Sequence, residues 1–267
     1  MRLVMGLALA SAAACVAAGD RFHIDVGLGA LSAESTRFHD VKLSDETDLA
    51  VLYGSASRYT EGEFDVGSGL RVGVGYDWTP RLHTLLEAGF DGELGFDGNA
   101  NYSGAGDRQP SEGELSTRRL LLAGRYQVWW RQVAGWARPL GFYVTAGAGV
   151  TEYRLTSFVQ RFPALRRGPG GKVPLTRLPS GRDRERTFML GFGVTAPWGT
   201  RNTLDFGYRF LNGGEVRTDV GNIDVVRYRA DGSRRDLAIP IDRTAADFDA
   251  HVLTVTWRRH FPRNLTR

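Results

Sequence analysis

Short runs in which every second residue is apolar recur along this chain and constrain its fold more than any other feature. The clearest run begins at Phe64 and ends at Trp78, and its apolar side chains alternate mainly with glycine, aspartate and arginine. A second run, from Phe22 to Ala30, has the same period of two. Because successive side chains of a β-strand point to opposite faces, this period predicts strands with one apolar face and one small or polar face.

Eight runs of this kind can be counted. Besides the two above, they start near Leu82, Arg119, Leu140, Thr187, Thr203 and Asp249. Each is about ten residues long, which is the length of a tilted strand that crosses a lipid bilayer. The chain contains 34 glycines and 14 phenylalanines, a composition that favours strands and turns over helices. We therefore expect an all-β fold.

The connections between these runs alternate between short and long. Short ones are expected at 79–81, 131–139 and 197–202, and long ones at 32–63, 91–117, 158–186 and 212–248. In an up-and-down arrangement, all long connections lie at one end and all short turns at the other, which is typical of outer-membrane barrels. We predict an eight-stranded antiparallel up-and-down transmembrane β-barrel with four long external loops and short periplasmic turns.

The last long connection contains a further hairpin signal. Residues 223–228 and 237–241 flank Asp231-Gly232, a dipeptide that is preferred in tight hairpin turns. Both faces of this hairpin carry charges, and charged side chains that face lipid are costly. We expect an external hairpin rather than a ninth and a tenth membrane strand.

The tryptophans indicate which face of the strands points outward. All six map near the short connections: Trp78, Trp129, Trp130, Trp136, Trp198 and Trp257. Tryptophan prefers the interface between membrane and water, so we predict an outward apolar face with an interface belt formed by Trp78, Trp130, Trp198 and Trp257. Candidates for the opposite belt are Phe64, Phe90, Phe188 and Phe210. The alternative is a soluble barrel, whose apolar face would point inward.

The opposite face combines glycines with isolated charges, as expected for the narrow lumen of a small barrel. We predict that five inward residues form a salt-bridged lumen network, because charges in a space of low dielectric need partners. They are Arg71, Glu87, Arg125, Asp205 and Arg209. This network is either a structural plug or a gate whose rearrangement opens a narrow pore.

Two of the long connections carry opposite charge. The connection at 158–186 has eight basic residues against Asp183 and Glu185: Arg161, Arg166, Arg167, Lys172, Arg177, Arg182, Arg184 and Arg186. The connection at 91–117 has six acidic residues, from Asp91 to Glu114, against Arg108 alone. Arginine matches phosphate and sulfate oxygens, so the basic loop is a candidate site for an anionic ligand. Alternatively, the two loops pair with each other.

The first 18 residues have the features of a secretory signal peptide. Arg2 is followed by an apolar stretch that ends at Ala18, and no later stretch of 18 apolar residues exists. We expect residues 1–18 to be the signal and residues 19–267 to be one barrel domain. The single cysteine, Cys15, lies in the signal, so the mature chain has no disulfide. Lipidation of Cys15 is the alternative.

Three segments resemble the opacity-protein and small outer-membrane-protein family. They are 71–82 (RVGVGYDWTPRL), 204–210 (LDFGYRF) and the closing strand that reaches Phe261. The resemblance spans the mature chain and implies an eight-stranded barrel whose external loops serve adhesion, with relatives that are structural or form narrow pores. It implies no catalytic residue.

Motifs for catalysis or metal binding are missing from the sequence. The five histidines show no H-x-H or H-E-x-x-H spacing, so we expect no metal site and no cofactor. His83 and His251 are each followed two residues later by leucine, so the His and Ser pair that outer-membrane lipid-A deacylases carry on one strand face is missing. We expect no catalytic residue and no enzyme activity.

We therefore expect an adhesin-like or structural surface protein in the outer membrane of a Gram-negative-type bacterium, acting through its external loops. The alternatives are a narrow porin-like channel and, third, a lipid-modifying enzyme. The expected partners are outer-membrane lipid and lipopolysaccharide, an anionic host glycan or surface receptor, and the barrel-assembly machinery. Nucleic acid is not expected, because the basic loop lacks interleaved stacking aromatics.

Overall fold

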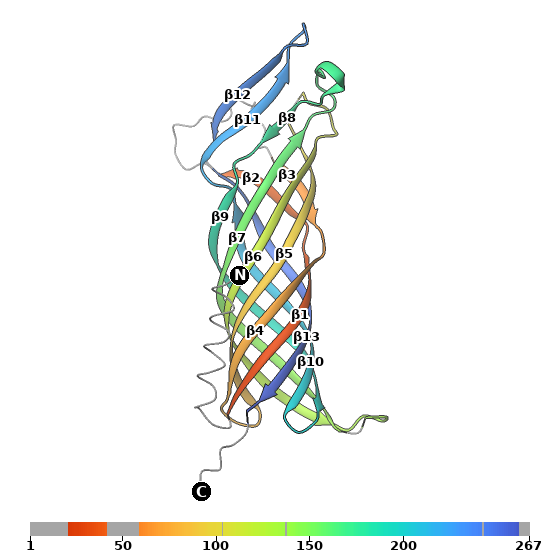
Figure 1. The fold of residues 1–267 in the computed structure, drawn as a ribbon, viewed down its shortest axis with the longest axis vertical. Helices are drawn as coiled ribbons and strands as arrows, with labels where there is room; N and C mark the ends of the chain where they lie inside the picture. The colour runs from red at the N-terminus through yellow and green to blue at the C-terminus, as the bar shows by residue number, and fades with distance from the viewer. Residues whose placement is uncertain (1–20, 42–58, 103, 137, 242, 262–267) are drawn as a thin grey trace.

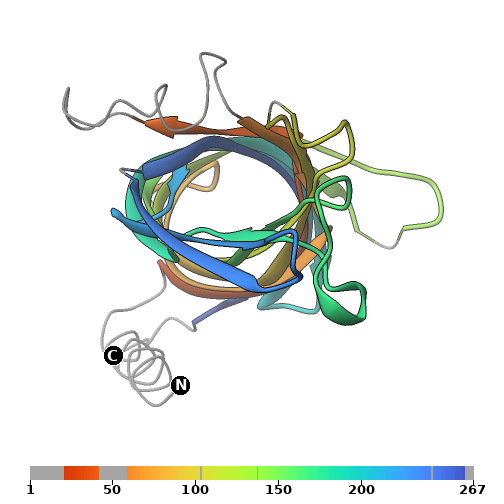
Figure 2. The same cartoon turned by 90° about the horizontal axis from the view of Figure 1, so that it is seen from above.

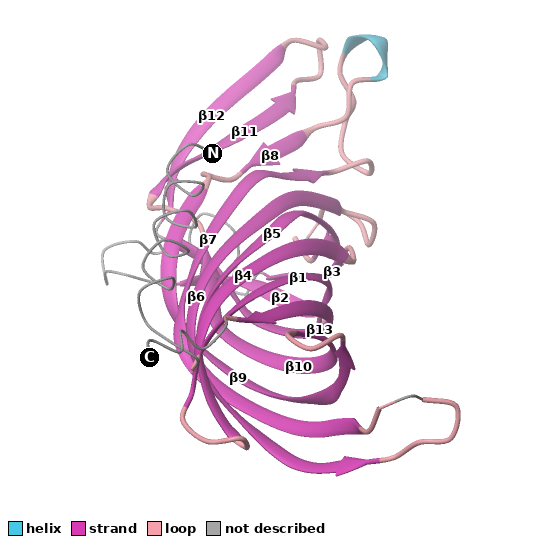
Figure 3. Cartoon of the chain, turned by 60° about the horizontal axis from the view of Figure 1, so that its bottom comes forward, coloured by secondary structure: helices cyan, strands magenta, loops and turns pink. Residues whose placement is uncertain are grey.

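The computed structural model describes residues 21–41, 59–102, 104–136, 138–241 and 243–261, and these residues are almost entirely β-structure (Figures 1 and 3). The strands are β1 (Phe22–Ala33), β2 (Thr36–Val41), β3 (Tyr59–Phe64), β4 (Gly67–Asp77), β5 (Leu82–Ala100), β6 (Pro110–Arg131), β7 (Leu140–Arg161), β8 (Leu175–Arg177), β9 (Gly181–Trp198), β10 (Asn202–Arg217), β11 (Gly221–Tyr228), β12 (Arg234–Ile241) and β13 (Arg243–His260). A single 3-10 turn, η1 (Pro169–Gly171), precedes β8. Within these ranges, no helix has the length and apolar character that a membrane span requires.

Antiparallel pairing joins eight of the strands into a closed cycle. The order around the cycle is β1, β4, β5, β6, β7, β9, β10 and β13, and β13 pairs again with β1. Seen from above, these strands surround a common axis (Figure 2). The cycle leaves no free sheet edge along its length, so backbone N–H and C=O groups find partners on both sides.

The described strands number thirteen rather than the eight expected. Two of the additional strands, β2 and β3, form almost entirely from the expected connection at 32–63. Residues 34–35 separate β2 from β1, and residues 65–66 separate β3 from β4. Above these breaks, β2 and β3 pair with each other and with β13 and β5, which continues the wall upward. The other additional strands, β8, β11 and β12, form from the expected long connections.

Apolar side chains point outward over the lower part of the wall, as predicted. Exposed members of this apolar band are Leu28, Leu70, Leu86, Leu120, Leu122, Val144, Leu190, Phe192, Phe206, Leu253 and Val255. The alternating strands bury the charged and small residues on the opposite, inward face. This arrangement is that of a membrane barrel and is the reverse of a soluble lipocalin-like barrel.

The upper part of the interior is an apolar core rather than a polar lumen. Its aromatic members, Phe38, Phe64, Phe96, Phe158 and Phe248, are buried and in mutual ring contact. The ring centroids of Phe38 lie 5.1 Å from Phe96 and 5.0 Å from Phe158. The interpretation of Phe64 as part of an outer aromatic belt was therefore wrong.

Bulges explain why this core was not predicted. The break at 65–66 exposes Val66 and turns both Phe64 and Gly67 inward, so the face changes between β3 and β4. The pairing register also shifts between Asp91 and Leu94 on β5, and both of these side chains are buried. One extra residue in a strand exchanges its two faces, so a strict period of two assigns the residues beyond it to the wrong side.

The strands extend well beyond the apolar band, so the long connections are shorter than predicted. Of the expected loop at 91–117, residues up to Ala100 belong to β5 and those from Pro110 belong to β6. Of the expected loop at 158–186, Arg161 lies on β7 and residues from Gly181 lie on β9. Charged side chains on the outward face do not end these strands. Pairing continues to Ser111↔Gln160 between β6 and β7 and to Leu155↔Gly181 between β7 and β9.

The expected external hairpin is present. The segments around Asp231-Gly232 form the β11–β12 hairpin, which pairs with β8 at the upper end and lies outside the cycle (Figure 1). In its turn, the side chain and the backbone N–H of Ser233 donate hydrogen bonds to Asp231, which lowers the pKa of this carboxyl. At the other end, called the short-turn end below, the connections are 78–81, 132–139 and 199–201, and Trp78, Trp130, Trp136 and Trp198 lie in or within two residues of them.

The outward apolar band predicts a strong position dependence of charged substitutions. Leu122→Arg on β6, whose side chain is 62% exposed, should lower the free energy of unfolding in lipid vesicles by about 2–4 kcal/mol. Val220→Arg, at a position 55% exposed beside β11 and off the band, should change it by less than about 0.5 kcal/mol. Urea titration of both variants measures the difference, and equal losses would contradict a lipid-facing band.

Candidate functional site

The lower layer of the lumen contains two arginines and two aspartates that neutralise one another. Arg258 donates to both carboxylate oxygens of Asp25, with Nε–Oδ1 at 2.9 Å and Nη2–Oδ2 at 2.8 Å. Its Nη2 also lies 3.4 Å from Asp205 Oδ2, and Asp205 is bound in turn by Arg125. All four side chains are buried. Arg125 additionally stacks on Tyr143, with 3.5 Å from its Cζ to the ring centroid.

A second charged layer lies above the first. Arg209 Nη1 donates to Glu87 Oε1 at 2.6 Å, and Arg71 Nε lies 3.7 Å from the same oxygen. Arg71 Nη2 lies 3.7 Å from Asp91 Oδ1, and Asp91 also pairs with Arg119. Three guanidinium groups thus share two carboxylates, and all five side chains are buried or nearly so. A void of about 20 Å³ lies beside Arg209 and Arg258.

The structure places all five predicted lumen residues inside the barrel, but in two groups. Arg125 and Asp205 belong to the lower layer, whereas Arg71, Glu87 and Arg209 belong to the upper one. Sequence reasoning missed four partners: Asp25, Asp91, Arg119 and Arg258. The alternation of side chains along each strand could have identified them, because each lies on the same face of its strand as the other inward residues. Asp91 was instead assigned to an acidic loop.

Glycines create the space that these long side chains need. A Cβ at Gly29 would collide with the guanidinium of Arg71, and one at Gly69 would collide with the carboxylate of Asp91. A Cβ at Gly193 or Gly207 would collide with the Tyr143 hydroxyl. The pairing of inward glycines with large polar residues is therefore steric in origin.

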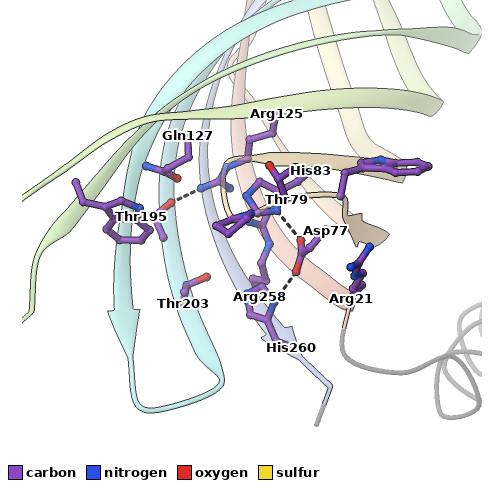
Figure 4. Close-up of a pocket in the computed structure, with 13 residues that line it drawn as sticks. Arg21, Asp77, Thr79, His83, Arg125, Gln127, Thr195, Thr203, Arg258 and His260 are labelled. Atoms are coloured by element: carbon purple, nitrogen blue, oxygen red, sulfur yellow. Dashed lines mark hydrogen bonds and ion pairs between the residues drawn. The ribbon is translucent and has the colours of Figure 1, made fainter. Parts of the chain in front are cut away.

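An open cavity of about 430 Å³ lies below the charged layers, at the short-turn end (Figure 4). Its wall includes Asp77, His83 and His260, and dashed lines in Figure 4 join both histidines to Asp77. His83 Nδ1 lies 2.5 Å from Asp77 Oδ1, and His260 Nδ1 lies 3.1 Å from Asp77 Oδ2. Sequence reasoning missed this cluster, because its members come from different strands.

The predicted basic residues are distributed over several elements at the upper end. Arg182 and Arg184 on β9 bind Glu152 of β7 at 2.6 and 2.9 Å, and Arg161 pairs with Glu112 of β6. The last pair joins the two oppositely charged segments. The basic patch that remains, exposed and without an ion pair to any described residue, consists of Arg166, Arg167, Lys172 and Arg177. Arg186, also exposed, lies lower on β9.

The basic patch is held next to the β11–β12 hairpin. Arg166 Nη1 donates to the carbonyl oxygen of Ala230 at 3.3 Å, and a Cβ at Gly168 would collide with the Tyr228 ring. The connection around η1 therefore packs against the hairpin turn. The turn contributes a further exposed basic residue, Arg229, next to the basic patch. These contacts place the part of the patch around Arg166 beside the hairpin.

The family model for the outer membrane protein beta-barrel domain matches residues 3–258. The chain belongs to this family. It is therefore a protein of the Gram-negative outer membrane, and its predicted resemblance to small outer-membrane barrel proteins is confirmed. No curated protein sequence matches the chain.

Several solved structures of outer-membrane proteins are similar to the chain at low identity. Neisserial surface protein A is 13% identical, with 90% of this chain and 97% of that chain covered and a TM-score of 0.37. OprG from Pseudomonas aeruginosa is 12% identical, with 91% and 97% covered and a TM-score of 0.45. Ail of Yersinia pestis, solved with the heparin analogue sucrose octasulfate, is 10% identical, with 89% and 99% covered and a TM-score of 0.32.

The buried ion pairs predict that a Glu→Ala substitution lowers the free energy of unfolding more inside the barrel than outside it. Glu87→Ala leaves Arg71 and Arg209 without their shared carboxylate, so the free energy of unfolding should fall by about 3–5 kcal/mol. Glu61→Ala removes the partner of Arg37 from a pair that is more than half exposed, and should cost less than about 1 kcal/mol. Urea unfolding in vesicles compares the two, and equal costs would contradict a desolvated network.

Proposed function

We propose that this protein is an adhesin-like or structural surface protein that acts through its external connections and not through its lumen. In this proposal, it is an eight-stranded antiparallel up-and-down transmembrane barrel with long external connections and short periplasmic turns. The closed cycle of eight paired strands supports this assignment, together with the outward apolar band and the tryptophans at the short-turn end, including Trp78, Trp130, Trp198 and Trp257.

The filled interior is the observation that carries the proposal. Two charged layers occupy the lower and middle lumen, and the aromatic core occupies the upper lumen. Opening a pore would require both separation of ion pairs in a low dielectric and displacement of five phenylalanines. The two costs favour the plug over the gate for the lumen network.

We also propose that the protein is not an enzyme. The hydrogen-bonding partners of the described histidines are Asp77, Tyr208 and Glu34, and none of these contacts involves a serine hydroxyl. A lipid-modifying activity of the histidine and serine type therefore has no support in the described residues.

The first test of the proposal is single-channel conductance of the refolded protein in a planar bilayer. Wild type and Glu87→Ala should both be silent, because the aromatic core closes the lumen above Glu87. Heat-shifted gel mobility shows that each sample is folded, and an added porin shows that the bilayer reports channels. Discrete steps from the wild type that change in Glu87→Ala would favour the gated narrow pore instead.

We propose an anionic polymer as the ligand of the external surface, either lipopolysaccharide phosphates or a sulfated glycan. Arg166, Arg167, Lys172 and Arg177 are exposed and form no ion pair with the described part of the chain, so their charges are available. Arginine forks match both phosphate and sulfate oxygens. The other partners of this proposal, membrane lipid and the barrel-assembly machinery, follow from the barrel itself.

Binding to heparin and to purified lipopolysaccharide, each measured at low and high salt, tests this ligand. The triple variant Arg166→Ala, Arg167→Ala, Lys172→Ala should lose roughly tenfold in affinity at low salt, because each exposed contact is worth about 0.5 kcal/mol. The matched control removes three exposed arginines at the short-turn end, Arg81→Ala, Arg131→Ala and Arg201→Ala, and should bind as wild type. Equal losses of affinity in the two triple variants would leave no role for the basic patch. Comparison of heparin with lipopolysaccharide separates sulfate recognition from phosphate recognition.

A further inference from the structure

We propose that the histidine and aspartate cluster at the short-turn end binds a divalent transition metal ion of the zinc type. Its three central members are His23 on β1, Asp77 on β4 and His260 on β13, and ligand atoms of these residues all lie within 4.8 Å of one another. His83 on β5 adds a third imidazole beside Asp77. Imidazole nitrogen with one carboxylate oxygen is a donor set that suits zinc, copper and nickel.

The strand pairing brings the four residues together. His23 is the direct cross-strand partner of His260, and Asp77 is the direct partner of His83. The first and last strands of the cycle meet here, so residues 237 positions apart become neighbours. The local spacings that sequence analysis tested could not detect such a site.

The environment of the buried His23 side chain points to a ligand. Its side chain is fully buried, and neither of its ring nitrogens has a hydrogen-bond partner of acceptable geometry in the described structure. Nδ1 lies 3.0 Å from Asp77 Oδ1, and Nε2 lies 3.8 Å from Asp25 Oδ1. A buried imidazole usually has a partner for each nitrogen, and a metal ion would use a lone pair that is otherwise unsatisfied.

Gly75 supplies the space for the His23 ring. It is paired with His23 across β1 and β4, and a Cβ at this position would collide with His23 Nε2 and with the neighbouring ring carbons. The sequence therefore places its smallest residue where the imidazole lies, and substitution of Gly75 changes the position of His23 without removing a ligand.

The charge of the cluster also favours a cation. Asp77 forms no ion pair with arginine or lysine in the described residues, and its partners are the three histidines. Arg258, in the layer above, is already bound to Asp25 and Asp205. With neutral imidazoles, the cluster carries one unneutralised negative charge in a half-buried setting, and a divalent ion would compensate it.

The required rearrangement is small, and access exists. In a tetrahedral site with bonds of about 2.1 Å, ligand atoms lie about 3.4 Å apart, so side-chain shifts of about 1 Å suffice. The open cavity of about 430 Å³ reaches Asp77, His83 and His260 from the short-turn end. His83 or a water molecule would complete the coordination.

Calorimetric titration of the refolded protein in detergent with zinc chloride tests the proposal. Wild type should bind one ion per chain, and His23→Ala, His260→Ala and Gly75→Ala should each weaken binding by about tenfold or more. His251→Ala is the matched control, because this histidine lies on the same strand as His260 but near its middle, and its side chain is 43% exposed. It should bind zinc as the wild type does.

Gel mobility before and after heating establishes that each variant is folded. If His23→Ala does not fold, His260→Gln and Gly75→Ala decide the question, since His260 is partly exposed. Electron paramagnetic resonance of the copper-loaded protein should show coupling to imidazole nitrogen that weakens in His260→Gln. Failure of the folded wild type to bind one ion, or equal binding by the wild type and the cluster variants, would overturn the proposal.

Discussion

A lipid bilayer offers no water to an unpaired backbone N–H or C=O, and the rest of this structure depends on that constraint. The eight paired strands meet it by closing on themselves, with β13 joined to β1. Closure of so few strands leaves a narrow interior, so each inward side chain must fit against those of the opposite wall. Glycines therefore stand beside long arginines, as Gly29 stands beside Arg71.

The narrow interior is filled in distinct layers. The cluster around Asp77 lies at the short-turn end, the two arginine and carboxylate layers follow, and the aromatic core closes the upper end. Ion pairs and hydrogen bonds connect the charged groups of the lower layers, and ring packing stabilises the aromatic core above them. The filled interior separates two accessible ends, with the basic patch and the β11–β12 hairpin at one and the open cavity at the other.

Folding pairs several of the predicted basic residues with carboxylates, which reduces the unpaired positive charge of the external surface. The sequence places eight basic residues between positions 158 and 186, but Arg161, Arg182 and Arg184 are paired with carboxylates of neighbouring strands. Strand extension causes this, because it brings Glu112 of β6 beside β7 and Glu152 of β7 beside Arg184 of β9. The charge that remains available is concentrated in the segment from Arg166 to Arg177, against the β11–β12 hairpin.

The sequence by itself determined the all-β class, the outward apolar band and the external hairpin, because a period of two and an Asp-Gly turn are local properties. It also located inward charges such as Glu87 and Asp205. Only the tertiary structure decided which charges pair, since partners such as Asp25 and Arg258 come from strands that are adjacent only after closure. Bulges decided the aromatic core, because one inserted residue reverses the faces of a strand, and closure likewise created the contact between His23 and His260.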